Sequence, residues 1–174
     1  MLFILIWFIT SCSFFRESIC ELNPNIDPLV DDTVYLLVEI TAQKNDIFRV
    51  YYMPEGEDSF KDLGYIEKKI ASSKESQTIL FAFPKGVYLK KIRLDISELR
   101  QNQNFTIHRT KFFFERKCFE IKDEFSYFFM ENKFIEKEKN TSYIYSTKFI
   151  NNQYDPHFLS KNLIDVMDYL LYKN

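Results

Sequence analysis

The stretch TVYLLVEIT, residues 33–41, decides the fold class of this chain. Its apolar side chains fall on every second position, at Val34, Leu36, Val38 and Ile40. Successive side chains of a β-strand point to opposite faces of a sheet, so this spacing predicts a strand with one face in a core.

Further segments of the same kind follow at short, regular intervals. Residues 47–53, 77–83, 88–96 and 105–115 alternate in polarity or are rich in β-branched and aromatic residues, with turn residues between them. Residues 65–71 fit a weaker strand or a short helix. Residues 119–121 fit a short strand, 123–132 a helix and 142–149 another strand. Many short strands joined by turns predict a mainly β protein, an antiparallel β-sandwich or jelly roll.

The C-terminal residues 160–172 predict one α-helix. Their apolar side chains recur at helical spacing, and Ser160 is a suitable N-cap. This apolar stripe is expected to pack on the core. The sequence therefore predicts a single domain over residues 33–174, a β-sandwich with a C-terminal helix.

The first residues of the chain indicate export. Residues 1–9 are all apolar, which is too few for a membrane-spanning helix of about 20 residues but suits a signal-peptide core of about 7–15 residues. Ile9-Thr-Ser-Cys12 resembles the lipobox of bacterial lipoproteins, in which cleavage precedes an acylated cysteine. The resemblance implies a signal peptide over residues 1–11, a lipid on Cys12 and a tether over residues 12–32.

Such a protein would sit in a bacterial cell envelope, held by lipid to the outer membrane or the cell surface. A signal peptide cut after Ser13 would instead release a secreted domain. An uncut signal anchor or a cytosolic chain would also be compatible with this sequence. The formal net charge is −2 and Lys and Arg do not cluster, so the sequence predicts no nucleic-acid partner.

Three cysteines are present, Cys12, Cys20 and Cys118. If Cys12 carries lipid, an oxidising compartment would permit a disulfide between Cys20 and Cys118. The alternative is an unpaired Cys20 in the tether and a buried Cys118. No Cys-x-x-Cys pair occurs, so no zinc site, and no other cofactor, is predicted.

The sequence contains no catalytic motif of the kinds that pair a nucleophile with a base or bind phosphate in a glycine-rich loop. His108 is expected to pack or to form hydrogen bonds within a strand. His157, in the run YDPHF (154–158), is expected to fix the start of the last helix. Carboxylates at 31–32, 55–58 and 123–124 fit solvated loops. A hydrolase acting on polysaccharide is therefore the third hypothesis.

Five tyrosines in predicted strands are candidates for stacking on sugar rings. Their hydroxyl groups tolerate water while their rings offer apolar faces; they are Tyr51, Tyr52, Tyr65, Tyr143 and Tyr145. Because Tyr51 and Tyr52 are adjacent, one of them must face away from the core of a sandwich. The alternative is that outward tyrosines only cover the sheet.

Three runs resemble a set of uncharacterised bacterial surface domains with carbohydrate-binding-like jelly rolls: YLKKIRLDI (88–96), FTIHR (105–109) and YDPHF (154–158). The resemblance implies a sandwich and an envelope location, but supplies no binding or catalytic residues. The leading hypothesis is a non-catalytic binding module for a glycan or another envelope component. Its rival is a structural or assembly lipoprotein that binds a protein partner, for example along a sheet edge.

The lipid anchor gives the first testable prediction. Replacing Cys12 with Ser removes the thiol that would be acylated, and each buried methylene of an acyl chain contributes about 0.8 kcal/mol to membrane binding. We expect Cys12→Ser to move the protein from the membrane fraction to the soluble fraction of the cell. A variant that stays membrane-bound and uncut would identify residues 1–15 as an uncleaved anchor instead.

Overall fold

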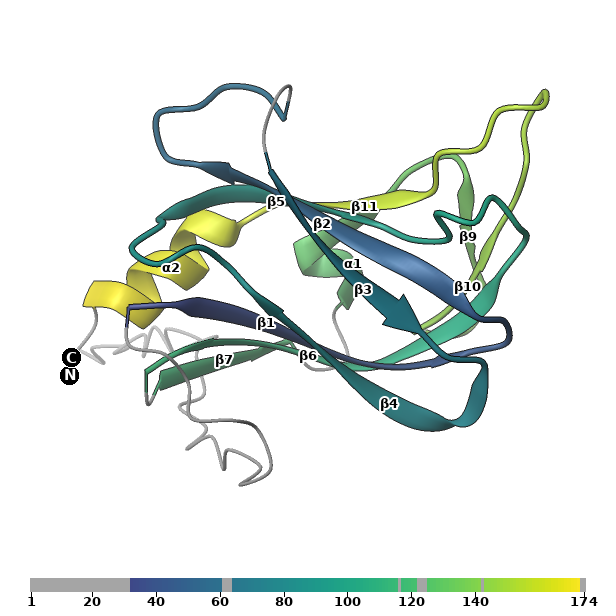
Figure 1. Ribbon diagram of the computed structural model, residues 1–174, viewed down its shortest axis with the longest axis horizontal. Helices are drawn as coiled ribbons and strands as arrows, with labels where there is room; N and C mark the ends of the chain where they lie inside the picture. The colour runs from purple at the N-terminus through teal and green to yellow at the C-terminus, as the bar shows by residue number, and fades with distance from the viewer. Residues whose placement is uncertain (1–31, 61–63, 116, 122–124, 142, 173–174) are drawn as a thin grey trace, which may run out of the picture.

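Two antiparallel sheets packed face to face form the fold (Figure 1). The computed structural model describes residues 32–60, 64–115, 117–121, 125–141 and 143–172. The predicted signal peptide and nearly all of the tether lie outside these residues. The mainly β antiparallel sandwich with one C-terminal helix, predicted from the sequence, is confirmed.

Sheet A is built around the stretch that decided the fold class. Its strand order is β4 (Ser73–Ala82), β1 (Val34–Ala42), β6 (Asn104–Phe114), β10 (Ile144–Thr147) and β9 (Ile135–Lys137). A sixth strand, β7 (Lys117–Ile121), pairs with the second half of β6. Strand β1 has a partner along both edges, β4 on one side and β6 on the other.

Sheet B has the order β3 (Tyr65–Ile70), β2 (Asp46–Pro54), β5 (Leu89–Asp95), β11 (His157–Ser160) and β8 (Phe129–Glu131). The weak segment at 65–71 is therefore a strand rather than a helix. Strands β8, β9 and β11 are only three or four residues long and were not predicted. The helix expected at 123–132 is reduced to α1 (Phe125–Phe128), after which the chain continues directly into β8.

Aromatic side chains fill the space between the sheets. Phe105 from sheet A meets Phe48 and Phe158 from sheet B at ring-centroid distances of 6.3 and 6.2 Å. Phe125 of α1 stacks on Phe129 at 4.6 Å and meets Phe158 edge-on at 5.0 Å. These edge-to-face and stacked arrangements are the preferred geometries of buried aromatic rings.

Helix α2 (Leu163–Tyr172) lies at one end of the sandwich and contacts strands of both sheets (Figure 1). It buries its predicted apolar stripe, Leu163, Val166, Met167 and Leu170. Ser160 is not its N-cap. The helix begins three residues later, and the Ser160 hydroxyl instead accepts the backbone N–H of Ile92 at 2.9 Å. No helix among the described residues is long and apolar enough to span a membrane.

The core gives the second prediction. Phe158 is fully buried among Phe105, Phe125 and Tyr145, so Phe158→Ala leaves a cavity and should lower the free energy of unfolding by about 3–5 kcal/mol. Leu99→Ala, at a side chain that is 53% exposed, is the control and should change it by less than about 0.5 kcal/mol. Urea unfolding measures both; equal effects would contradict the core described here.

Candidate functional site

The outer face of sheet B carries a row of side chains that runs across all five strands. The register pairs Tyr65 with Tyr51, Tyr51 with Arg93, Arg93 with Leu159 and Leu159 with Met130. Directly paired residues point to the same face of a sheet. We call this set the aromatic row. Its two ends, Tyr65 and Met130, are the most exposed members.

A second row, rich in charge, runs beside the first. The register places Glu67 opposite Arg49, Arg49 opposite Asp95 and Asp95 opposite His157. We call this set the charged row. Neighbouring rows on one face are two residues apart along each strand, so the two rows form one continuous surface.

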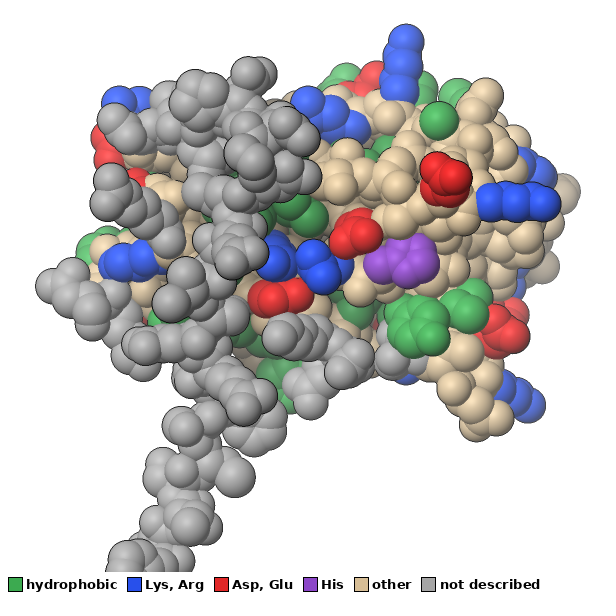
Figure 2. Space-filling model, turned by 90° about the horizontal axis from the view of Figure 1, so that it is seen from below, with side chains coloured by type: hydrophobic (Ala, Val, Ile, Leu, Met, Phe, Trp, Pro, Cys, Tyr) green, Lys and Arg blue, Asp and Glu red, His purple; other side chains and the backbone are tan. Residues whose placement is uncertain are grey.

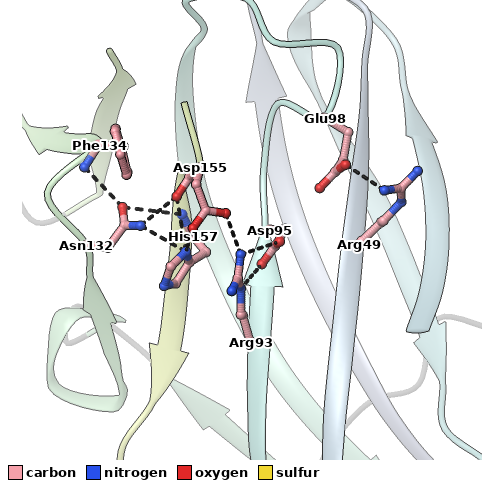
Figure 3. Close-up of polar contacts among 8 residues, drawn as sticks. All are labelled: Arg49, Arg93, Asp95, Glu98, Asn132, Phe134, Asp155 and His157. Carbon is pink, nitrogen blue, oxygen red and sulfur yellow. Dashed lines mark hydrogen bonds and ion pairs between the residues drawn. The ribbon is translucent and has the colours of Figure 1, made fainter. Parts of the chain in front are cut away.

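Arg93 is the centre of this surface (Figure 3). Its Nε and one terminal nitrogen donate to the two carboxylate oxygens of Asp95 at 2.6 and 2.8 Å. The same terminal nitrogen donates to Asp155 at 2.5 Å. Two parallel N–H···O bonds fix the plane of the guanidinium, which is the geometry that Arg forms best with carboxylates.

Arg49 is held in a similar way. It donates to Glu67 at 2.8 Å and to Glu98 at 2.7 Å. Its guanidinium carbon also lies 4.9 Å from the ring centroid of Tyr65, while that of Arg93 lies 5.9 Å from the ring centroid of Tyr51. The two tyrosine rings are 5.4 Å apart and tilted by 50°. The cation–π contacts therefore hold both rings beside fixed charges.

Burial raises the pKa of two carboxyl groups on this surface, those of Asp95 and Glu98. Desolvation raises the pKa of Asp95 to about 6, although the ion pair with Arg93 opposes the shift. Desolvation also raises the pKa of Glu98, with Arg49 opposing it. Asp95 is thus a carboxyl group that titrates just below neutral pH in the folded protein.

Asn132 orients His157 at the edge of the charged row. The amide oxygen of Asn132 accepts the backbone N–H groups of Phe134 and His157, at 3.1 and 3.4 Å. Its amide nitrogen therefore faces His157 Nδ1, at 2.9 Å, and donates to the carbonyl of Asp155 at 2.6 Å. Burial and the nearby Arg93 lower the pKa of His157. His157 Nδ1 also lies 3.1 Å from the carbonyl oxygen of Asp155. With its pKa lowered, the imidazole is neutral at pH 7.

A tight turn brings Asp155 to Arg93. Asn151 and Asn152 both have positive φ, 50° and 61°, and the flanking Ile150 and Gln153 exchange two backbone hydrogen bonds. This is the geometry of a type I′ hairpin turn, where Asn is favoured. Tyr154, just after the turn, donates its hydroxyl to the carbonyl of Gln101, and the same oxygen lies 2.7 Å from the Thr147 hydroxyl; these contacts anchor the chain ahead of Asp155.

These groups line a hollow of about 300 Å³ whose walls include Tyr51, Arg93, Asp95, Glu98 and Tyr154. A larger hollow of about 1290 Å³ lies across the end of sheet A. Its two aromatic wall residues, Phe105 and Tyr145, are buried in the core. Seen from the side of sheet A, acidic and basic side chains lie interspersed on the part of the surface that is described (Figure 2). We therefore place the candidate site on sheet B.

The structure brings together two of the five predicted tyrosines, Tyr51 and Tyr65. Tyr52 points the other way and packs edge-on against Phe83 at 5.8 Å, as the alternation of adjacent residues required. Tyr143 is exposed but lies beside His108 and Arg109 on sheet A. Tyr145 is 1% exposed, so it packs the core and has no face for a surface ligand.

The predicted lipidation site Cys12 and the predicted disulfide partner Cys20 lie outside the described residues. Cys118 is buried and disulfide-bonded, so its pairing with Cys20 in particular stays a prediction. Among the described residues, no group of three or more His, Cys, Asp or Glu side chains is placed to hold a metal ion. His108 is exposed and bonds Thr41 at 3.2 Å.

Sequence reasoning missed the arginine–carboxylate network. One signal was available, because Arg93 and Asp95 are two residues apart in a predicted strand and so share a face. The positions of Arg49, Asp155 and Asn132 gave no such signal, since only the strand register brings them near.

Comparison with known proteins gives no relative from which a function could be transferred. No protein-family model, no curated protein and no solved structure matches this chain. Its function has to be inferred from its own residues and their geometry.

Asp95 gives the third prediction. The pKa of this carboxyl is 3.8 when it is fully solvated and about 6 in the folded protein. Between these values the folded chain binds a proton that the unfolded chain has released, so this group adds stability as the pH falls from 6 towards 3.8. In Asp95→Asn this position carries an amide, which does not bind a proton in this pH range. We expect the wild type to gain up to about 3 kcal/mol over Asp95→Asn between pH 7 and pH 4, at about 1.36 kcal/mol per pKa unit.

Urea unfolding of both proteins at several pH values measures this difference. Taking the difference removes the contribution of the other carboxylates, which titrate in both proteins. A difference that stays constant from pH 7 to pH 4 would show that Asp95 has an ordinary pKa.

Proposed function

We propose that the outer face of sheet B binds a neutral or amino saccharide of the cell envelope, without chemical change to it. The observation that carries the proposal is the aromatic row beside the charged row. Sugars present apolar ring faces and a rim of hydroxyl groups, and these two rows offer a stacking surface and fixed hydrogen-bonding groups side by side.

The rigidity of the surface favours this role. Arg49 and Arg93 lie over the rings of Tyr65 and Tyr51, and each guanidinium is itself held by two carboxylates. A surface whose side chains are already ordered loses little conformational entropy when a ligand binds. Tyr65 is still 51% exposed, so its ring remains accessible for stacking.

The balance of charge suggests the class of sugar. Two guanidinium groups, of Arg49 and Arg93, face four carboxyl groups, of Glu67, Asp95, Glu98 and Asp155. Carboxylate oxygens accept hydrogen bonds from hydroxyl groups but repel anions. The site therefore suits neutral or amino sugars better than uronic acids, sulfated sugars or phosphate-bearing polymers.

The same network argues for binding rather than hydrolysis. A glycosidase needs two carboxyl groups about 5–9.5 Å apart on either side of the scissile bond. Here Asp95 and Asp155 are both bonded to the same guanidinium, that of Arg93, and so are held as partners of a cation. We accordingly keep a polysaccharide hydrolase as the third hypothesis.

A protein partner is the second candidate. Met130 is exposed at one end of the aromatic row and Leu159 lies half-buried beside it, and apolar groups of this kind also form the centres of protein interfaces. The location proposed for either role is the envelope, with Cys12 as the lipid anchor. The disulfide at Cys118 supports it, since disulfides persist in oxidising compartments.

Glycan binding gives the fourth prediction. The purified protein should bind neutral or amino saccharides on a glycan array, and not acidic ones. Tyr65→Ala removes the most accessible stacking ring and should weaken the binding of an array-positive saccharide about tenfold, or about 1.4 kcal/mol. Isothermal titration calorimetry measures this loss.

Tyr143→Ala is the matched control, because Tyr143 is about as exposed as Tyr65, at 46%, but lies on sheet A. It should leave the affinity unchanged. Equal losses for the two variants, or binding confined to acidic glycans, would contradict the proposal. An array without hits, together with an envelope protein captured by the wild type but not by Tyr65→Ala, would favour the protein-binding candidate.

A further inference from the structure

The outer face of sheet A is apolar at one end, although the core of the sandwich lies on the other side of that sheet. Strand β1 is buried at five consecutive positions, Val34–Val38. Val34, Leu36 and Val38 belong to the main core, whereas Tyr35 and Leu37 belong to a separate apolar cluster. Neighbouring residues of a strand point to opposite faces, so this cluster lies outside the sandwich.

Cross-strand pairing makes the cluster continuous over four strands. Leu80 of β4 pairs with Leu37, Tyr35 pairs with Phe113 of β6, and Phe113 pairs with Cys118 of β7. We call these five residues the outer patch. Tyr35, Leu37, Phe113 and Cys118 are only 5, 8, 4 and 4% exposed. Side chains on the outer face of a sheet reach such values only when another segment covers them.

The polarity of the same face changes abruptly beyond the outer patch. Further along β1 and β6, Arg109 lies 3.8 Å from Glu39 and 3.3 Å from Glu120. That half of the face carries charged pairs in place of apolar side chains, and Arg109 is about half exposed. The buried apolar side chains of this face therefore gather at the end of the sheet where β1 begins.

We propose that residues 13–31, which lead into β1, cross the outer patch and are fastened there by a disulfide between Cys20 and Cys118. Cys118 lies within the patch and is disulfide-bonded. The chain has two other cysteines, Cys12 and Cys20, and both precede β1. The bond that holds Cys118 therefore ties the patch to the N-terminal part of the chain.

The length and composition of this segment fit the patch. Cys118 lies two strands away from β1, about 10 Å at the usual strand spacing, and the 14 residues from Cys20 to Val34 can span up to about 50 Å. The segment supplies apolar side chains to cover the patch: Phe14, Phe15, Ile19, Leu22, Ile26, Leu29 and Val30.

Cys20 is the partner because Cys12 has a different role in the proposed anchor, where its sulfur is consumed in a thioether to lipid. The Cys20–Cys118 bond forms by exchange with the disulfide of an envelope thiol oxidoreductase. That enzyme takes up the two electrons and two protons that the thiols lose, and becomes a dithiol.

The consequence is an orientation for the domain. Cys20 is only eight positions after Cys12, at most about 29 Å of extended chain. An anchored chain fastened at Cys118 holds sheet A towards the membrane and leaves the outer face of sheet B turned away from it. This inference does not depend on which ligand sheet B binds.

Peptide mapping under non-reducing conditions tests the disulfide in the full chain, purified from the cell envelope. Trypsin cuts after Arg16, Lys44 and Lys117, so Cys12, Cys20 and Cys118 fall in different peptides. We expect the peptide 118–122 to be joined to 17–44 and released by reduction. A free thiol at Cys118, or a link from 118–122 to the peptide that contains Cys12, overturns the proposal.

Cleavage by a glutamate-specific protease tests the docking itself. The bonds after Glu17 and Glu21 should be cut at least tenfold faster in Cys20→Ser than in the oxidised wild type. Leu80→Asp places a charge in the patch with both cysteines present and should also speed the cleavage. Thr78→Asp is the matched control, two residues earlier on the same strand and face, at an exposed side chain.

Circular dichroism confirms that each variant is folded before the comparison. Equal cleavage rates in the wild type and in Cys20→Ser overturn the docking, and so do equal rates in Leu80→Asp and Thr78→Asp. A binding assay on sheet B reports separately on the proposed function, because none of these substitutions lies on that sheet.

Discussion

Strand β1 is the constraint on which the rest of the structure depends. It is paired along both edges and its first half is buried on both faces. A strand in this position needs a layer on each side, because the hydrophobic free energy is gained only where apolar surface leaves water. Sheet B supplies one layer, and this fixes the spacing and the aromatic filling of the sandwich. The apolar cluster on the other side needs a second cover as well, and residues 13–31 are the cover that we propose.

On sheet B the governing interaction is the bidentate pair of Arg93 and Asp95. Desolvation of Asp95 would favour its neutral form, and Arg93 compensates for part of that cost. Because Asp155 shares the same guanidinium, the hairpin at 150–153 and strand β5 are joined through one side chain. A charged group removed from this set would leave its partner buried and uncompensated, which is more damaging than losing an exposed ion pair.

Much of the fold was predictable because alternation is a local property, which Val34 to Ile40 show within a few residues. Strands β9 and β11 could not be found in this way, since three or four residues are too few to show a period. The candidate site was less predictable than the fold. Nothing in the sequence separated Tyr51 and Tyr65 from Tyr145, which has the same chemistry and lies in the core. The meeting of these two rings with Arg93 depends on register, which is set by turns and by the whole hydrophobic pattern.

The aromatic row runs across the strands, and each of its five residues comes from a different strand. Its members are spread over the chain from Tyr51 to Leu159 and form no contiguous motif. Loops between the strands can therefore lengthen, shorten or diverge without moving the row, provided that each strand keeps its register. A distant relative would preserve this surface as a pattern of single residues separated by variable gaps. Common descent would then be easier to recognise from superposed sheets than from aligned sequences.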